Sequence, residues 1–157
     1  MRLYRRERNQ YLPVSQIEAW QFFSHPINLP EITPPWLSFR LTQKVPNSIH
    51  AGMMISYRLK PLLGLPVTWI SEITHVNEPV FFVDEQRFGP YKFWHHQHLF
   101  KAVSNGTQVI DIVHYAIGYG ILGRLVHRFI VSPRLDDIFD YRHEKLKQIF
   151  SGPTSAR

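Results

Sequence analysis

The 157-residue chain contains no cysteine. A disulfide framework, a thiol nucleophile and a thiolate metal site are therefore excluded. The chain also lacks any run close to the ~20 consecutive apolar residues that a membrane-spanning helix needs. Residues 1–10 are charged and no apolar run follows them, so we expect no signal peptide. These absences predict a soluble, cytoplasmic protein.

Charge of one sign is not concentrated anywhere along the chain. The formal net charge is +6, from 18 Lys and Arg against 12 Asp and Glu, and the basic residues fall into small scattered clusters. Without a long basic run or a Gly-Arg repeat we expect no nucleic-acid partner, and a weak attraction to anionic membrane surfaces stays open. A Gly-x-Ser-x-Gly elbow is absent, so Ser-His-Asp hydrolysis has no support.

Apolar and aromatic residues are abundant. Hydrophobic residues make up 44% and aromatic residues 14% of the chain, while twelve prolines and eight glycines divide it into short elements. This composition is ample for one hydrophobic core. We expect a single domain at residues 1–151 and a flexible tail at residues 152–157.

Alternation of apolar and polar residues dominates the chain as far as residue 117, which indicates strands. We expect strands at residues 2–12, 38–45, 53–60, 67–76, 80–88, 91–103 and 107–117. A meander of this kind must bury one face against another layer. The sequence therefore predicts an α+β fold with an antiparallel sheet of about seven strands.

Helices are expected at three places. A capping box of Ser15 and Glu18 begins a short helix after the first strand, and residues 27–32 form a second one. After Gly120 the apolar period changes to 3.6, which predicts a long C-terminal helix that Pro133 either kinks or splits. We interpret its first apolar stripe, Leu122 to Phe129, as core and cavity lining.

The segment Gly89 to Phe100 combines aromatic rings with three histidines in four residues. Side chains on a strand alternate between two faces. One face carries Trp94, His96, His98 and Phe100, which suits the wall of a mostly apolar cavity that contains a few polar groups. The opposite face is also apolar at Phe93, Leu99, Ile110 and Ile112, and is wetter at His95, Gln97, Lys101 and His114. Which face lines the cavity therefore stays open.

Turn chemistry predicts how the strands pair. If Asn105 and Gly106 form a two-residue turn, the pairs are Phe100 with Asp111, His98 with Val113 and His96 with Tyr115. The same counting across Asn77 and Glu78 places Trp69, Ser71 and Ile73 on one face with Phe82, Asp84 and Gln86. The register thus gathers His96, His98, Asp111 and Tyr115 between Trp94 and Phe100.

The ordered elements and several local segments resemble the START/Bet v1-like (SRPBCC) superfamily, and in particular its bacterial polyketide cyclase/dehydrase-like (coenzyme Q-binding-like) branch. The resemblance is carried by Asn28-Leu29, Ile32 to Trp36, Trp69, Glu72-Ile73, Phe82 to Gln86, Gly89-Pro90-Tyr91, Trp94, His96, His98, Phe100, Gly106-Thr107, Asp111, Tyr115 and Ile138 to Arg142. It implies the helix-grip fold, in which a curved sheet wraps around a long C-terminal helix, with two short helices after the first strand. Pro133 departs from the pattern, because related chains keep this region as one helix.

The resemblance implies an internal pocket for a mostly apolar small molecule, such as a polyketide, isoprenoid quinone, lipid or aromatic metabolite, held by a carrier or sensor. We expect the ligand-binding residues to be Trp69, Phe82, Asp84, Trp94, His96, His98, Phe100, Asp111 and Tyr115. No cofactor is expected. Fold alone is a weak warrant for any reaction, so enzyme activity is left open.

Two interpretations of the polar cluster stay open. His96, His98, Asp111 and Tyr115 are candidates for acid-base catalysis in an aromatase/cyclase or dehydratase. The same groups would otherwise orient a ligand or satisfy one another as a buried network. His96-x-His98 with Asp84 or Asp111 also has a spacing that metals use, but the resemblance implies no metal and we expect none.

A further alternative is an interaction protein. The uncharged segment from Pro61 to Pro66 is either folded under as a pocket lid or exposed as a contact patch. Together with the basic residues it would act at a membrane surface or on a partner protein. The sequence does not determine the oligomeric state.

Overall fold

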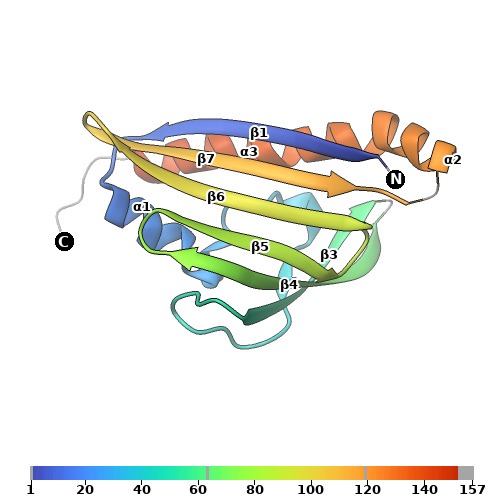
Figure 1. Cartoon of the computed structure of the whole chain (residues 1–157), viewed down its shortest axis with the longest axis horizontal. Helices are drawn as coiled ribbons and strands as arrows, with labels where there is room; N and C mark the ends of the chain where they lie inside the picture. The colour runs from blue at the N-terminus through green and yellow to red at the C-terminus, as the bar shows by residue number, and fades with distance from the viewer. Residues whose placement is uncertain (1, 63, 119, 152–157) are drawn as a thin grey trace.

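A computed structural model describes residues 2–62, 64–118 and 120–151. Its centre is one seven-stranded antiparallel sheet with the strand order β1-β7-β6-β5-β4-β3-β2. The strands are β1 (Leu3–Leu12), β2 (Arg40–Leu41), β3 (Met53–Leu62), β4 (Leu65–Asn77), β5 (Phe81–Phe88), β6 (Phe93–Val103) and β7 (Gly106–Ala116). The predicted α+β class and helix-grip architecture are confirmed, with the long C-terminal helix lying across the sheet (Figure 1).

The predicted capping box is confirmed at the start of α1 (Gln16–Phe23). The Glu18 backbone N–H donates to Ser15 Oγ, and the Ser15 backbone N–H donates to Glu18 Oε2 over 2.9 Å. These bonds satisfy donors that a helix start would otherwise leave without partners. Trp20 of α1 then packs edge-on against Phe82 and Phe100 of the sheet, with ring centroids 5.9 and 5.7 Å away. The short helix thereby closes one end of the core.

The C-terminal helical region runs without a break from α2 (Gly120–Val126) through a π-helical turn, η3 (His127–Val131), into α3 (Ser132–Phe150). The Ser132 N–H bonds to the His127 carbonyl, five residues back. Pro133 has no N–H to donate, so the wider turn lies directly before the position where the regular bond is lost. In the described residues, no helix is long and apolar enough to cross a membrane.

Two expected elements are wrong. The strand at residues 38–45 reduces to β2, because Ser38 takes a left-handed conformation (φ 47°) that ends the extended chain. The helix at residues 27–32 is a 3₁₀ turn, η1 (Pro26–Asn28), followed later by η2 (Pro35–Leu37). Pro30 lacks the N–H that a continuing helix requires.

The β6–β7 register is shifted by two residues from the expectation. Val103 pairs with Gly106, so Ser104 and Asn105 form the turn, with Asn105 in the left-handed region (φ 63°). A Cβ on Gly106 would lie 2.4 Å from the Leu12 carbonyl oxygen. This glycine therefore allows the end of β1 to approach closely rather than forming the turn. An even shift keeps every side chain on its predicted face.

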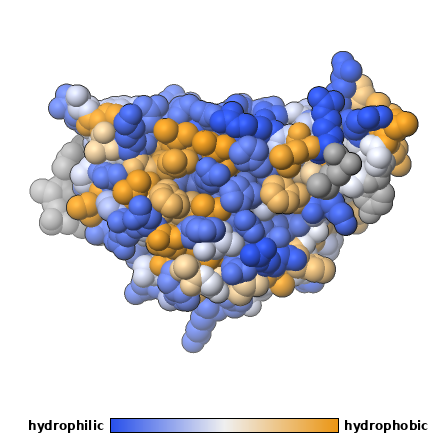
Figure 2. All heavy atoms as spheres, in the orientation of Figure 1, coloured by the Kyte–Doolittle hydropathy of each residue, from blue (hydrophilic) through white to orange (hydrophobic). Residues whose placement is uncertain are grey.

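The two faces of the sheet differ in character. The face with His96, His98 and Phe100 is buried toward the helices, which resolves the question left open by the sequence. The outer face mixes apolar and polar residues (Figure 2). It carries ion pairs such as Arg87 Nε–Glu72 Oε2 at 2.5 Å.

Candidate functional site

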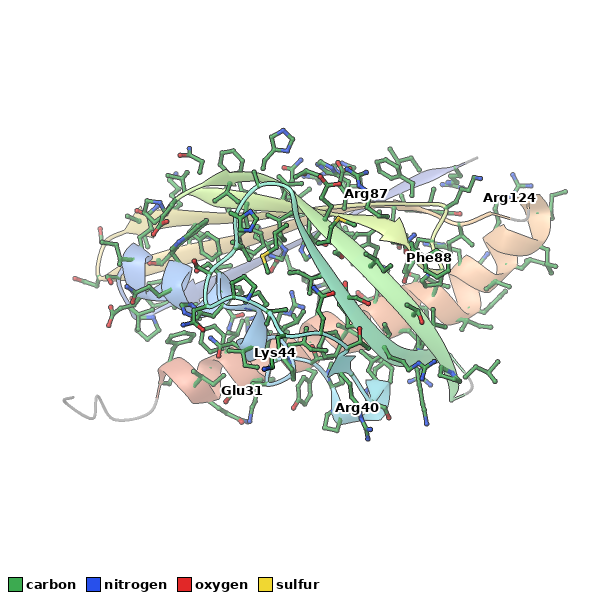
Figure 3. The ribbon with its side chains drawn as sticks, turned by 90° about the horizontal axis from the view of Figure 1, so that it is seen from below. Glu31, Arg40, Lys44, Arg87, Phe88 and Arg124 are labelled. Carbon is green, nitrogen blue, oxygen red and sulfur yellow. The ribbon has the colours of Figure 1, made fainter. Side chains whose placement is uncertain are left out.

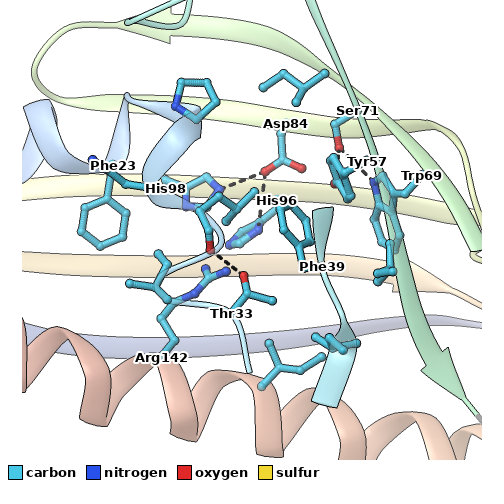
Figure 4. A pocket seen from close by; sticks show the side chains of 18 of the residues that line it. Phe23, Thr33, Phe39, Tyr57, Trp69, Ser71, Asp84, His96, His98 and Arg142 are labelled. Carbon is cyan, nitrogen blue, oxygen red and sulfur yellow. Dashed lines mark hydrogen bonds and ion pairs between the residues drawn. The ribbon is translucent and has the colours of Figure 1, made fainter. Parts of the chain in front are cut away.

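A cavity of about 200 Å³ lies between the inner face of the sheet, the short helical turns and α3. Its walls come from β3, β4, β5 and β6, from the segment Phe22 to Phe39, and from α3 (Figure 4). Six of the nine predicted binding residues line it: Trp69, Phe82, Asp84, Trp94, His96 and His98. The cavity is mostly apolar and contains a few polar groups, which is the usual character of a small-molecule site.

Aromatic rings from β3, β4 and β6 form one wall of the cavity. Trp69 meets Trp94 edge to face, with centroids 5.2 Å apart, and Tyr57 stacks on Trp69 at 5.9 Å. Trp69 Nε1 donates to Ser71 Oγ over 3.0 Å, and the Tyr57 hydroxyl lies 2.9 Å from the same oxygen. Burial, with the nearby Asp84 charge, raises the pKa of Tyr57 well above its usual value. The polar atoms of both rings are thus satisfied, which leaves ring surfaces for an apolar ligand.

Two histidines and two aspartates form a buried cluster beside these rings. His98 Nε2 lies 2.9 Å from Asp84 Oδ2, and His96 Nε2 lies 2.8 Å from Asp111 Oδ1. The two imidazole rings are tilted against each other with centroids 3.7 Å apart. The observed register places Asp111 directly opposite His98, whereas the predicted register placed it opposite Phe100. Asp84 of β5 pairs with His96 and completes the cluster.

Burial and hydrogen bonding act against each other in this cluster. Burial opposes charge on every member. Bonds to the histidines nevertheless hold the pKa of Asp111 well below its usual value and lower that of Asp84. The two carboxylates raise the pKa of His98 in spite of its burial, whereas burial and the His98 charge lower the pKa of His96. As the pH falls, His98 therefore becomes protonated before His96 does.

Arg142 reaches the cavity from α3, where it continues the apolar stripe of Leu135 and Phe139. Figure 4 shows its side chain pointing from the helix toward the histidines. Its Nε is buried and makes no hydrogen bond within the described residues, and its guanidinium lies 5.5 Å from the Phe139 ring centroid. An arginine on an apolar helical stripe was the sequence signal for this site residue.

Three predicted site residues are buried without lining the cavity. Phe100 packs under α1, and Asp111 lies behind the histidines. The Tyr115 hydroxyl lies 2.9 Å from His127 Nε2 on the helical turn η3, and Tyr115 pairs with Trp94 rather than His96. Tyr115 is therefore separate from the His–Asp cluster, contrary to the expected four-residue set.

A second cavity of about 290 Å³ adjoins the first one. Both are lined by Pro61, Tyr91, Leu135 and Ile138, and the second extends to Leu122 and Val126 of α2. The predicted loop from Pro61 to Pro66 is the end of the β3–β4 hairpin, and its residue 63 lies outside the described part of the chain.

The helix stripe that we expected to form core and cavity lining does line the second cavity at Leu122 and Val126, but it is otherwise largely exposed. Leu122, Leu125 and Phe129 keep 65%, 51% and 67% of their surface accessible. This region extends beyond the end of the sheet (Figure 1), where the sheet does not cover it. Arg124 projects outward there (Figure 3).

No protein-family model and no curated protein matches the chain. Several solved structures do match the chain. The protein TTHA0849 from Thermus thermophilus is 18% identical, with a TM-score of 0.66 over 98% of this chain and 100% of its own. Major latex-like protein 151 from Panax ginseng is 11% identical, with a TM-score of 0.66 over 94% and 97%. Ara h 8.0201 is 13% identical, with a TM-score of 0.61 over 94% and 99%. The chain therefore shares its fold with these structures, and this is the Bet v1-like helix-grip fold that the resemblance implied.

Proposed function

We propose that the protein binds a mostly apolar small molecule that carries one polar group, as a carrier or sensor. The observation that supports this is the His–Asp cluster on the sheet wall of an otherwise apolar, aromatic cavity, with Arg142 pointing toward it from α3. Each Å² of apolar surface that enters the cavity contributes roughly 25 cal/mol. The polar wall would orient the single polar group. Polyketides, isoprenoid quinones, lipids and aromatic metabolites all have this character.

Cavity size limits the ligand further. The volume of about 200 Å³ is below the range that drug-sized ligands usually occupy. A compact aromatic head group would fit there, and an attached chain would continue past Ile138 into the adjoining cavity of about 290 Å³. The two cavities together favour a head-and-tail molecule.

Native mass spectrometry of freshly purified protein tests this proposal. We expect a bound apolar adduct, whose mass identifies the ligand class. Trp94→Ala should weaken binding at least tenfold, whereas Trp36→Ala, which changes a 41%-exposed ring outside the cavity, should not. An absence of adducts, together with no binding from a panel of quinones, aromatic acids and fatty acids, would contradict the proposal.

An enzyme of the cyclase or dehydratase type is a second candidate, favoured by the contact between His96 and Asp111 at the cavity wall. Such a pair can transfer a proton to or from a carbonyl-bearing ligand. We expect His96→Ala or His98→Ala to abolish turnover of a polyketide-like substrate while binding is kept. Failure of every carbonyl substrate to react would eliminate this candidate.

A role at a membrane surface is favoured by the exposed stripe on α2 and η3. Exposed Leu125 and Phe129 alternate with Arg124 and Arg128, a pattern that suits an anionic lipid surface. Phosphatidylserine-containing vesicles should bind the protein in flotation, and Phe129→Glu should reduce this binding. Ile27→Glu, at an equally exposed site in η1, is the control. Equal binding by both variants, or none by the unmodified protein, would contradict this role.

A further inference from the structure

Three ligand atoms of the His–Asp cluster converge on the cavity side. Asp84 Oδ2 lies 2.9 Å from His98 Nε2 and 3.5 Å from His96 Nδ1, and the three residues offer one ligand atom each within 4.8 Å of one another. Nitrogen and oxygen ligands about 2.1 Å from a tetrahedral metal ion are separated by roughly 3.4 Å. The observed spacings bracket this separation, so small side-chain adjustments bring all three atoms to one ion.

Asp111 supports both imidazoles from behind. The ring nitrogens that point away from Asp84 both face its Oδ1, at 2.8 Å from His96 Nε2 and 2.9 Å from His98 Nδ1. A carboxylate behind a metal-bound histidine fixes the orientation and tautomer of the ring. His98 Nδ1 is buried and its ring is out of line for a hydrogen bond.

We propose that Asp84, His96 and His98 form a binding site for a divalent transition metal of the Zn²⁺ or Fe²⁺ type, with Asp111 as the positioning residue. Two histidines and one carboxylate with free coordination positions are a donor set that such ions accept. The three ligands line the cavity and Asp111 does not, so the free positions face the bound molecule. The site goes beyond ligand binding, because the metal would bind whether or not an apolar molecule is present.

Charge in the cavity supports the same assignment. The side chains of Asp84 and Asp111 keep only 16% and 9% of their surface accessible, and carboxylates so largely removed from water require compensation by positive charge. A divalent ion lying between the imidazoles and Asp84 supplies that compensation. With Arg142 on the opposite wall, the free coordination position would then favour an anionic oxygen, such as an enolate, phenolate or carboxylate of the ligand.

Metal titration of the chelator-treated full chain tests the proposal. Calorimetry with Zn²⁺ should give one tight site per chain, and Co²⁺ should produce the visible absorption bands of a low-symmetry site with few ligands. Asp84→Asn and His98→Gln should each abolish the tight site. Asp111→Asn should weaken it by about 10–100-fold, as expected for a group behind the ligands.

His95→Gln is the matched control. His95 lies on the same strand but on the outer face, 2.8 Å from Glu85, so its loss should leave the tight site unchanged. Circular dichroism of each variant verifies folding, and His96→Gln gives a second ligand variant if His98→Gln fails to fold. The proposal is overturned if the unmodified chain binds neither ion tightly. It is also overturned if folded Asp84→Asn and a folded histidine variant both keep the site, or if His95→Gln alone removes it.

Discussion

At the scale of single residues, Ser71 is the group that satisfies two cavity rings at once. Ser71→Ala would leave Trp69 Nε1 and the Tyr57 hydroxyl without their buried partner. We expect the free energy of unfolding to fall by about 1–3 kcal/mol, as measured by chemical denaturation. Ser56→Ala, which removes an exposed bond to Thr42, should change it by less than about 0.5 kcal/mol. Equal effects of the two variants would contradict this account.

His127 should make stability depend on pH. Partial burial, followed by the charges of Arg6 and Arg2, lowers the pKa of His127, whose ring stacks on Tyr4 and contacts the Tyr115 hydroxyl. Between about pH 7.5 and about pH 5.5, the unfolded chain therefore binds this proton before the folded chain does, and stability falls. The stability difference between the unmodified protein and His127→Gln should shrink over this range in denaturation experiments. A constant difference would show that the imidazole does not titrate differently on folding.

The sequence predicted much of the site because strand alternation assigns side chains to faces without knowledge of the register. His96, His98 and Asp111 share a face under either hairpin count, so their proximity survived a two-residue error. The face of Asp84 was predicted by the same kind of counting across the turn at Asn77 and Glu78. Tyr115 was expected directly opposite His96 but lies opposite Trp94, because the identity of a cross-strand partner does depend on the register. Arg142 was not among the predicted site residues, because a helical stripe shows which way a side chain points but not that it reaches a cavity.

At the scale of elements, Gly106 links the β6–β7 turn to the end of β1. A methyl group there would meet the Leu12 carbonyl oxygen at 2.4 Å and the Tyr11 ring at 2.6 Å. Gly106→Ala should therefore cost about 1–3 kcal/mol of stability. Gly118→Ala is the control, since no described atom lies within 4 Å of its added Cβ. Thermal unfolding of the two variants checks the difference, and a neutral Gly106→Ala would contradict the close packing.

Among the elements, strands with long alternation were predicted well, whereas the short strand β2 and the exposed helix α2 were not. β4 and β7 follow the expected ranges closely because each alternates over many residues. β2 was overestimated, since nothing in its short sequence marks the left-handed Ser38. The stripe from Leu122 to Phe129 was assigned to core and cavity lining, and its exposure was missed because periodicity alone cannot show that the helix extends past the sheet. In each case the sequence lacks the information on how the element packs against the rest of the fold.

At the scale of the whole molecule, the two cavities meet at a few shared side chains. Ile138 is one of them and lies on α3 between the polar wall and α2. Ile138→Trp should narrow the connection, so a ligand with a long chain should lose affinity at least tenfold while its head group alone binds as before. Calorimetric titration of a matched short and long pair measures this. Equal losses for both would show that the two cavities do not serve one ligand.

The edge-to-face pair of Trp69 and Trp94 should make the fluorescence of the protein sensitive to occupation of the cavity. Both indoles lie in the cavity wall, so a molecule that enters changes the polarity around two of the four tryptophans in the chain. Their ultraviolet emission should shift or be quenched on occupation, most strongly by a quinone, which accepts an electron from an excited indole. Trp36→Phe would remove the exposed contribution to the background. The protein thus contains its own fluorescent reporter and needs no attached dye.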